Sequence, residues 1–212
     1  DYDLLLRCKR LPRYDVRGCR VIVPDEYAAM LGLVPAIASN VPYVPAEHLY
    51  DYQRFFTSLA IKKKKFCLFW DCGLGKTLAE LEFARHCLAS MPMQKRVLIV
   101  TPLMVVPQFV QESFRFYGMA PEIVASGALA EWMESGKSRL GITNWEAFKK
   151  PVGNTAVGAF IADECSIWKN FYGTIGRNAL AFSRGLEWKL ACTGTPAPND
   201  CQEYANHAVF AD

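Results

Sequence analysis

The segment from Trp70 to Thr77, WDCGLGKT, has the residue types and the spacing of a loop that binds phosphate groups. It matches the pattern G-x-x-x-x-G-K-[ST] except that Trp70 stands at the first glycine. In such a loop the backbone N–H groups face the phosphates, Lys76 reaches them, and the Thr77 hydroxyl ligates Mg²⁺. The plainer alternative is a glycine turn between a strand and a helix. The residues expected to bind the ligand are Cys72, Gly73, Leu74, Gly75, Lys76 and Thr77.

A second polar group follows an apolar run of strand length, where Asp163 and Glu164 come directly after Ala162. Hydrolysis of a nucleoside triphosphate needs an acid that holds Mg²⁺, here Asp163, and a base that orients and deprotonates water, here Glu164. A solvated loop end is the alternative interpretation of the two carboxylates. Ligands of open α/β sheets bind at the carboxyl ends of the strands, which favours one site that joins these acids to Lys76.

Strands and helices alternate in the part of the chain that must position these residues. Buried apolar strands separated by helices indicate an α/β fold, with a mostly parallel sheet covered by helices on both faces. A short helix from 144 would be capped by Asn144. The expected strands are 65–70, 96–101, 122–126, 139–143, 156–164, which ends in the two carboxylates, and 188–195, and the expected helices are 77–89, 105–117, 128–135 and 144–150.

The first 45 residues differ in composition from the rest. They combine short β-prone runs with a segment, 25–33, that could form a short helix, and a proline-containing connector follows. We expect a small basic accessory element at 1–45 and the main domain at 46–212. A lysine run at 62–65 is typical of a solvated surface, with a DNA contact as the alternative. The basic residues of the accessory element, which could contact a duplex, are Arg7, Lys9, Arg10, Arg13, Arg17 and Arg20.

Composition excludes several classes of protein. The longest apolar stretch, 97–110, is interrupted by Pro102 and Pro107, so a spanning helix of about 20 apolar residues is not expected. Eight scattered cysteines without a C-x-x-C pair indicate reduced thiols in a cytoplasmic protein and disfavour a structural zinc site. A net charge of +3 neither demands nor excludes a nucleic-acid partner.

Six segments occur in the order of the Q motif and motifs I, Ia, Ib, II and III, and together they resemble the first motor lobe of superfamily two helicases. The D-x-G-L-G-K-T loop and the T-G-T-P-x-x-N ending resemble the Snf2-type branch, including phage-encoded members. The resemblance implies a RecA-like P-loop domain that binds ATP and Mg²⁺ and acts on DNA. The segments are LYDYQRFF (49–56), WDCGLGKT (70–77), VTPLMVVPQFVQE (100–112), ITNWEAF (142–148), ADECSIWKN (162–170) and ACTGTPAPND (191–200).

The resemblance also implies roles for residues that no pattern assigns by itself. Gln53 would pair with adenine through its amide, which offers a donor and an acceptor side by side. Without the other segments, Gln53 would more simply belong to an exposed helix start, and the 193–195 turn to an ordinary strand end. The residues implied for coupling are Thr193, Gly194 and Thr195, and those implied for contacts to nucleic-acid phosphates are Thr101, Pro102, Thr143 and Asn144.

Two departures from the family pattern bear on the expected function. Ser166 stands where related sequences carry an imidazole or a carboxylate, which puts the coupling contact in question. The chain also ends soon after motif III, so we expect a second RecA-like lobe, with its arginine finger, as a partner. We therefore expect the ATP-binding lobe of a DNA-dependent ATPase that moves on DNA, duplex more than single-stranded. The alternatives are a nucleotide-dependent DNA-binding module without productive hydrolysis and an unrelated P-loop enzyme such as a small-molecule kinase.

Overall fold

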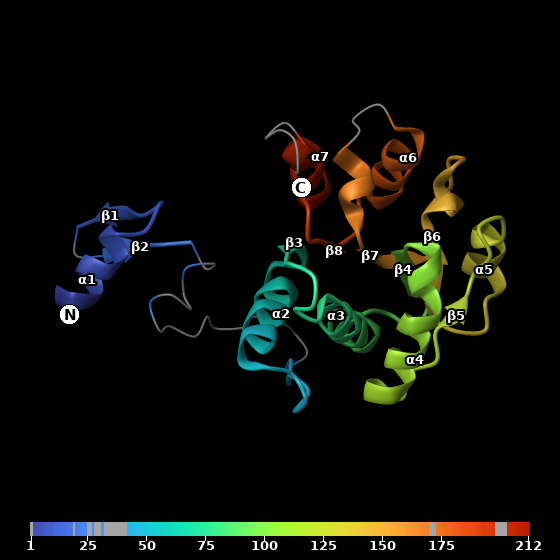
Figure 1. Cartoon of the computed structure of the whole chain (residues 1–212), viewed down its shortest axis with the longest axis horizontal. Helices are drawn as coiled ribbons and strands as arrows, with labels where there is room; N and C mark the ends of the chain where they lie inside the picture. Colours follow the sequence, from blue (N-terminus) through green and yellow to red (C-terminus); the bar gives the residue numbers. More distant parts are fainter. Residues whose placement is uncertain are drawn as a thin grey trace.

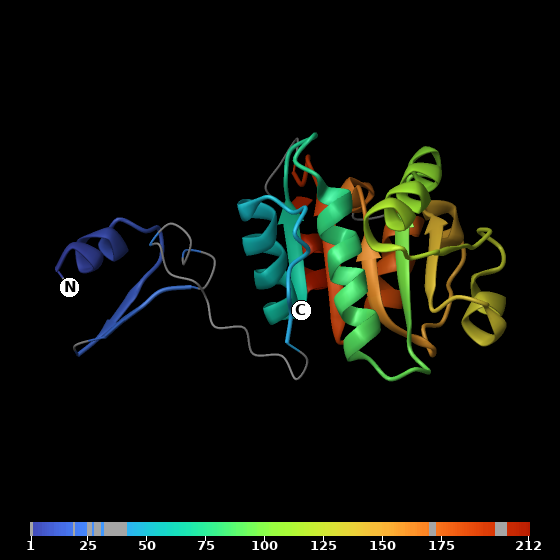
Figure 2. The ribbon, with the colours of Figure 1, turned by 90° about the horizontal axis from the view of Figure 1, so that it is seen from below.

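The computed structural model describes residues 2–18, 20–24, 27, 31, 42–169, 173–197 and 203–212. Within these residues a parallel sheet of six strands runs in the order β3-β8-β7-β4-β6-β5. Figure 2 shows its strands side by side between helices. The α/β prediction is confirmed. The strands are β3 (Lys65–Phe69), β4 (Arg96–Thr101), β5 (Glu122–Ile123), β6 (Leu140–Asn144), β7 (Val157–Ala162) and β8 (Trp188–Thr193).

Helices cover both faces of the sheet because successive residues of its buried strands point to opposite sides. In β4, Val97 and Ile99 pack with α2, α3 and α4, whereas Leu98 and Val100 pack with α5, α6 and α7. Figure 1 labels both groups. The helices are α2 (Asp51–Lys63), α3 (Lys76–Ser90), α4 (Val106–Tyr117), α5 (Leu129–Ser135), α6 (Thr174–Ser183) and α7 (Tyr204–Ala211), with 3₁₀ turns at Leu103–Val105, Trp145–Phe148 and Cys165–Lys169.

The N-terminal element contains a helix, α1 (Tyr2–Lys9), and an antiparallel hairpin of β1 (Asp15–Arg17) and β2 (Arg20–Ile22). The β-prone interpretation was wrong for 2–9, where Leu4 and Cys8 lie one helical turn apart and pack with Leu11. The two strands agree with the β-prone runs expected there, whereas their antiparallel pairing was not predicted. Apart from Tyr27 and Leu31, the helix expected at 25–33 lies outside the described residues.

Three further observations qualify the sequence-based outline. Helices α6 and α7 were not predicted, α2 was anticipated only as an exposed helix start at Gln53, which is buried, and β5 is shorter than the strand expected at 122–126. The division at residue 45 stays a prediction, although Tyr43 already packs in the core of the main domain. Among the described residues, no helix combines the length and the apolar character that crossing a bilayer requires.

Candidate nucleotide-binding site

The loop between β3 and α3 has the backbone of a phosphate cradle. Gly73 and Gly75 have φ angles of +83° and +73°, a region that glycine adopts without strain. Gly75 is the N-cap of α3, so the helix of 15 residues begins at Lys76 with its positive end at the loop. Nothing lies within 4 Å of a Cβ placed on Gly73, whereas one on Gly75 would collide with the side-chain amide of Gln53. The loop therefore has open space at Gly73, while the Cys72 N–H donates to Asp71 Oδ1 at 2.8 Å and the Leu74 N–H to the Asp71 carbonyl at 3.5 Å.

Trp70, the departure from the loop pattern, is a buried anchor. Its ring packs edge-on against Tyr52 and Phe56, with centroid distances of 5.4 and 5.9 Å. Its carbonyl oxygen accepts a hydrogen bond of 3.2 Å from Lys76 Nζ. A Cβ on Gly194 would lie 3.3 Å from that same oxygen, so the turn after β8 approaches the loop closely. The Trp70 indole thus fastens the start of the loop to α2. The usual loop pattern has a glycine at this position, which could not make such a contact.

Lys76 connects the loop to the acidic segment after β7. Its Nζ atom lies 3.4 Å from Glu164 Oε1, and the lysine side chain is only 10% exposed. The distance is within the range of a direct ion pair, and partial burial reduces the screening of the two charges. The sequence-based expectation that these residues share one site agrees with this geometry, although their catalytic roles stay predictions.

Asp163 is held by two neighbouring elements at the end of β7. The hydroxyl of Thr101, from β4, donates to Asp163 Oδ2 at 2.6 Å, and the indole N–H of Trp145 donates to the Asp163 carbonyl at 3.2 Å. Burial raises the pKa of the Asp163 carboxyl, and the Thr101 hydrogen bond opposes that shift. The carboxylate is consequently fixed in direction, with one oxygen committed to the protein.

Glu164 has a φ angle of +46°, in the left-handed region that side chains other than glycine rarely adopt. Its Oε2 atom accepts a hydrogen bond of 3.3 Å from the Thr193 hydroxyl, and that hydroxyl oxygen accepts one of 3.1 Å from the Thr195 N–H. Backbone strain of this kind persists where surrounding contacts impose it and is concentrated at functional sites. The turn implied for coupling, 193–195, therefore lies beside Glu164 and the loop.

The imidazole of His207, from α7, lies between the acidic segment and the turn after β8. In related sequences an imidazole can stand at the position that Ser166 has here. His207 Nε2 lies 3.2 Å from the Pro196 carbonyl oxygen, and Nδ1 lies 3.7 Å from Cys165 Sγ. His207 is buried, which lowers its pKa. Sequence reasoning missed this residue because it lies 41 positions after Ser166, as 207 − 166 shows. Asn170 and Asn199 lie outside the described residues.

Gln53 is buried and bonded to the protein through both ends of its amide. Its oxygen accepts a hydrogen bond of 3.0 Å from the Tyr50 N–H, and its NH₂ group donates to the Leu74 carbonyl at 3.1 Å. The Tyr52 hydroxyl donates to the same Leu74 oxygen at 3.1 Å. In this geometry Gln53 holds the loop, and pairing with adenine, which stays a prediction, requires this buried amide to become accessible.

The residues implied for nucleic-acid contacts lie at the carboxyl ends of β4 and β6, and the side-chain oxygens of three of them make hydrogen bonds within the protein. Thr101 and Thr143 are buried, and their hydroxyls donate to Asp163 and to the Val124 carbonyl. Asn144 caps the 3₁₀ turn through a 2.9 Å hydrogen bond from the Glu146 N–H. Pro102 is half-buried. Contacts through the two hydroxyls would require each to leave its present partner, and the nucleic-acid roles of all four residues stay predictions.

A cavity of about 480 Å³ lies beside the loop, and some of the residues that line it were not singled out from the sequence. Lys76, Thr77, Asp163 and Glu164 line one part of it. The other wall comes from α4, whose register along the cavity could not be read from its apolar spacing alone. The α4 residues that line it are Gln108, Glu112, Arg115 and Phe116.

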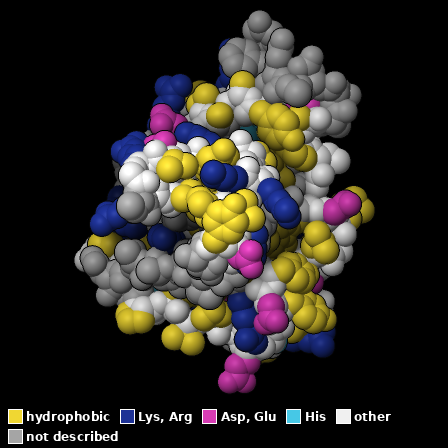
Figure 3. Space-filling model, turned by 90° about the vertical axis from the view of Figure 1, so that its left-hand side faces the viewer, with side chains coloured by type: hydrophobic (Ala, Val, Ile, Leu, Met, Phe, Trp, Pro, Cys, Tyr) yellow, Lys and Arg dark blue, Asp and Glu magenta, His cyan; other side chains and the backbone are white. Residues whose placement is uncertain are grey.

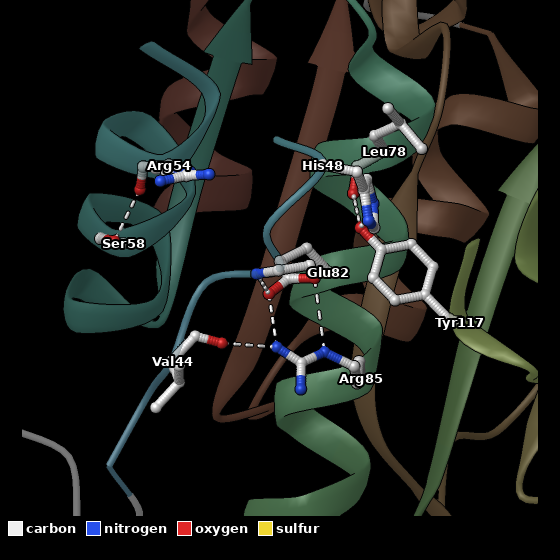
Figure 4. Close-up of polar contacts among 9 residues, drawn as sticks. Val44, His48, Arg54, Ser58, Leu78, Glu82, Arg85 and Tyr117 are labelled. Atoms are coloured by element: carbon white, nitrogen blue, oxygen red, sulfur yellow. Dashed lines mark hydrogen bonds and ion pairs between the residues drawn. The ribbon is translucent and has the colours of Figure 1, made fainter. Parts of the chain in front are cut away.

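Helix α3 is braced from the opposite side by the segment that precedes α2 (Figure 4). Arg85 donates to Glu82 Oε1 at 2.5 Å and to the Val44 carbonyl at 2.7 Å, and Glu82 Oε1 also accepts from the Ala46 N–H at 3.2 Å. From α4, the Tyr117 hydroxyl donates to the Leu78 carbonyl at 3.3 Å. These contacts fix the helix whose first turn carries Lys76 and Thr77.

One more carboxyl on α3 faces the site from inside the fold. Glu80 is fully buried, and neither of its oxygens has a hydrogen-bond partner among the described residues. It follows Lys76 by one helical turn. Burial and the nearby Asp163 carboxylate raise the pKa of Glu80 well above its ordinary value. The interior beneath the loop therefore favours a neutral Glu80.

Comparison with known proteins places this geometry in a fold family. No family model and no curated protein sequence matches the chain. The SWI2/SNF2 ATPase core of Sulfolobus solfataricus, solved in complex with dsDNA, superposes with a TM-score of 0.65 at 21% identity, over 81% of this chain and 37% of that one. The UvsW helicase of bacteriophage T4 gives 0.63 at 12% identity, over 88% and 73%. The Hef helicase domain of Pyrococcus furiosus gives 0.57 at 18% identity, over 75% and 35%.

The chain accordingly shares its fold with domains of these SWI2/SNF2 and helicase structures, as the ordered motifs predicted. It spans little more than a third of the SWI2/SNF2 and Hef chains that it matches. The likeness at these identities is one of fold, so the chemistry must be argued from the site itself.

Proposed function

We propose that this chain is the ATP-binding motor lobe of a DNA-dependent ATPase, of the helicase or translocase type, which uses ATP hydrolysis to move along DNA. The observation that carries the proposal is the meeting of Lys76 and Glu164 at 3.4 Å, beside Asp163 and beneath the glycine loop. A cation for phosphates, an acid and a base at the carboxyl edge of a parallel sheet are the groups that hydrolysis of a triphosphate needs.

The residues present fit Mg²⁺. The Thr77 hydroxyl and the Asp163 carboxylate both line the cavity, and oxygen ligands of this kind suit a small hard cation. The second Asp163 oxygen, the one that does not accept from Thr101, would take the metal side. Bound with the triphosphate, Mg²⁺ would neutralise charge on the β and γ phosphates.

The protein groups then have distinct tasks. Lys76 and the loop N–H groups hold the phosphates, and this draws the lysine away from Glu164. Glu164 accepts a proton from water as the water oxygen bonds to the γ phosphorus, while the bond from that phosphorus to the bridging oxygen breaks and ADP leaves. Thr193, bonded to Glu164, links the base to the turn after β8. The adenine would be recognised by Gln53 once its buried amide becomes accessible.

DNA is the proposed partner, and duplex DNA in particular. The SWI2/SNF2 core with the same fold was solved with dsDNA, which supports this choice. A second RecA-like lobe is the other proposed partner, because an arginine finger from a facing lobe can contribute roughly 10³ to 10⁵ in rate. With ATP and DNA as ligands, we place the protein inside a cell, bacterial or phage-infected.

The test is phosphate release from Mg-ATP by the purified chain without nucleic acid, with single-stranded DNA and with duplex DNA. Glu164→Gln serves as the blank. We expect ATP binding in every case and turnover that duplex DNA raises and the blank lacks. If the folded Lys76→Ala variant bound ATP as the unaltered chain does, the assignment of the site would be wrong.

A second candidate function is a nucleotide-dependent DNA-binding module without productive hydrolysis. It is favoured by the contacts of the proposed base, since Glu164 Oε1 lies 3.4 Å from Lys76 and Oε2 accepts a hydrogen bond from Thr193. In that case ATP would change DNA affinity, while phosphate release would stay at the level of the Glu164→Gln blank. Phosphate release would then be measured again with a second RecA-like lobe added as a separate protein. Turnover that appears on this addition would mean that the chain carries half of an active site, and no turnover that the site is inactive.

A further inference from the structure

The outer face of the N-terminal hairpin concentrates positive charge. In the register of the hairpin Arg17 lies directly opposite Arg20, and Val16 lies opposite Val21. Val21 packs on the small core around Cys8, so alternation places both arginines on the face turned away from that core. Like charges in directly opposed positions destabilise a strand pair. The Arg17 guanidinium donates to Asp15 Oδ2 at 2.8 Å, which offsets only part of this repulsion.

A hollow of about 440 Å³ lies on the same face. Its walls carry three cationic side chains, Arg13, Arg17 and Lys63, against one acid, Asp15, and they include Tyr14 and Ile22. Lys63 comes from the last turn of α2, so the hollow lies where the main domain meets the hairpin. Figure 3, which views the molecule from this side, shows Lys and Arg side chains at several places, with Asp and Glu side chains among them.

The charge excess is local. The described part of 2–24 contains six Lys and Arg residues, all exposed, and two Asp residues, whereas the whole chain carries a net charge of only +3. Guanidinium groups that stay hydrated bind phosphate oxygens through paired N–H groups, and they read no sequence in doing so. None of these residues lines the cavity beside the nucleotide-binding loop, so that site does not account for the positive charge of the hairpin face.

We propose that the hairpin face formed by Arg13, Arg17 and Arg20, with Lys63 beside it, is a second DNA contact that binds the phosphate backbone of a duplex. This proposal rests on the proposed function, since DNA is the substrate of the motor. The N-terminal element would bind the duplex without reading its sequence, at a place separate from the carboxyl ends of β4 and β6. Like-charge repulsion across the hairpin is relieved when phosphates lie between the arginines.

The experiment measures binding of the full chain to a short labelled duplex by fluorescence anisotropy, without nucleotide and over a series of salt concentrations. The variant is Arg17→Ala/Arg20→Ala. The matched control is Lys137→Ala/Arg184→Ala, which removes the same charge from exposed positions outside the hairpin, before β6 and before β8. We expect the hairpin variant to lose affinity several-fold and its slope of log K against log salt to shrink by about 2, at about 0.9 for each phosphate contact.

ATP binding and thermal unfolding of both variants verify that each is folded, and removal of the opposed arginines should leave the hairpin no less stable. The proposal is overturned if the hairpin variant keeps its DNA affinity, or if the control loses as much. It is also overturned if the variant loses binding to anionic lipid vesicles while its DNA affinity is unchanged. A chain that binds no duplex at all would instead count against the proposed function.

Discussion

Lys76 Nζ lies 3.4 Å from Glu164 Oε1, so the residue that would hold phosphates is already paired with the residue that would activate water. The other oxygen of Glu164 accepts a hydrogen bond from Thr193. Phosphates that attract Lys76 must therefore compete with Glu164, and their arrival changes the balance of contacts on a carboxylate that is also tied to β8. Occupancy of the loop is thus linked to the turn at 193–195 through one side chain.

The first prediction concerns that competition. Glu164→Gln removes the negative charge that Lys76 meets, so we expect ATP to bind a few-fold more tightly while phosphate release falls by roughly 10² or more, the usual scale for loss of a general base. ATP affinity from a fluorescent analogue and phosphate release would be measured together. Glu112→Gln is the control, because Glu112 lines the same cavity from α4. Unchanged affinity in Glu164→Gln would mean that the ion pair does not restrain Lys76.

The second prediction concerns the hydroxyl that orients Asp163. Thr101→Val leaves a buried carboxylate without its 2.6 Å hydrogen bond, and we expect a loss of roughly 1–3 kcal/mol in the free energy of unfolding. Mg²⁺-dependent ATP binding should weaken as well, since the carboxylate is no longer fixed in direction. Thr101→Ser keeps the hydroxyl and removes one methyl group, which costs about 0.8 kcal/mol and should leave Mg²⁺ dependence intact. Denaturant titration and ATP binding at varied Mg²⁺ concentrations separate the two variants.

Periodicity was sufficient to predict the parallel sheet because its strands are buried on both faces and read as apolar runs. It was insufficient for α2 and α7, whose assignment needs tertiary contacts: α2 carries polar residues such as Gln53 and Thr57 that are buried against the loop or the core. Local pattern also misjudged 2–9, where helical spacing of Leu4 and Cys8 outweighed the β-prone character of the surrounding residues.

The site followed the same division. The loop and the acidic pair could be predicted because the chemistry restricts residue type and spacing at Lys76 and Asp163. The contacts made by Thr101 and His207 could not, since both depend on which strands and helices become neighbours in space. A hydroxyl implied for nucleic acid turned out to face Asp163, because β4 lies directly beside β7 in the sheet.

The third prediction uses the two glycines of the loop as a matched pair. Both have positive φ angles, so alanine at either position costs roughly 1–2 kcal/mol from the backbone alone. Alanine at Gly75 would in addition collide with the Gln53 amide, whereas Gly73 faces open space. We expect Gly75→Ala to unfold at a lower temperature than Gly73→Ala and to bind ATP more weakly. Adding Gln53→Ala should recover part of the difference, and equal melting temperatures for the two single variants would contradict the contact.

The fourth prediction concerns the buried Glu80. Its pKa is higher in the folded protein than in the unfolded chain, because burial and Asp163 both oppose ionisation. The folded state therefore keeps a proton that the unfolded state releases once the pH rises above about 4.3. The stability associated with this proton is complete below the unfolded pKa and is lost as the pH rises toward the folded one.

Glu80→Gln removes this titration while it keeps the shape of the side chain. We expect the variant to be more stable than the unaltered chain at neutral pH, and its advantage in the free energy of unfolding to grow from pH 5 to pH 8, over the range where only the unfolded chain is ionised. Denaturant unfolding at several pH values measures the difference. Glu134→Gln, at an exposed position of α5, is the control and should show no such trend. A difference between Glu80→Gln and the unaltered chain that stayed constant with pH would mean that Glu80 is ionised inside the fold, and that the nearby Lys76 outweighs burial and Asp163.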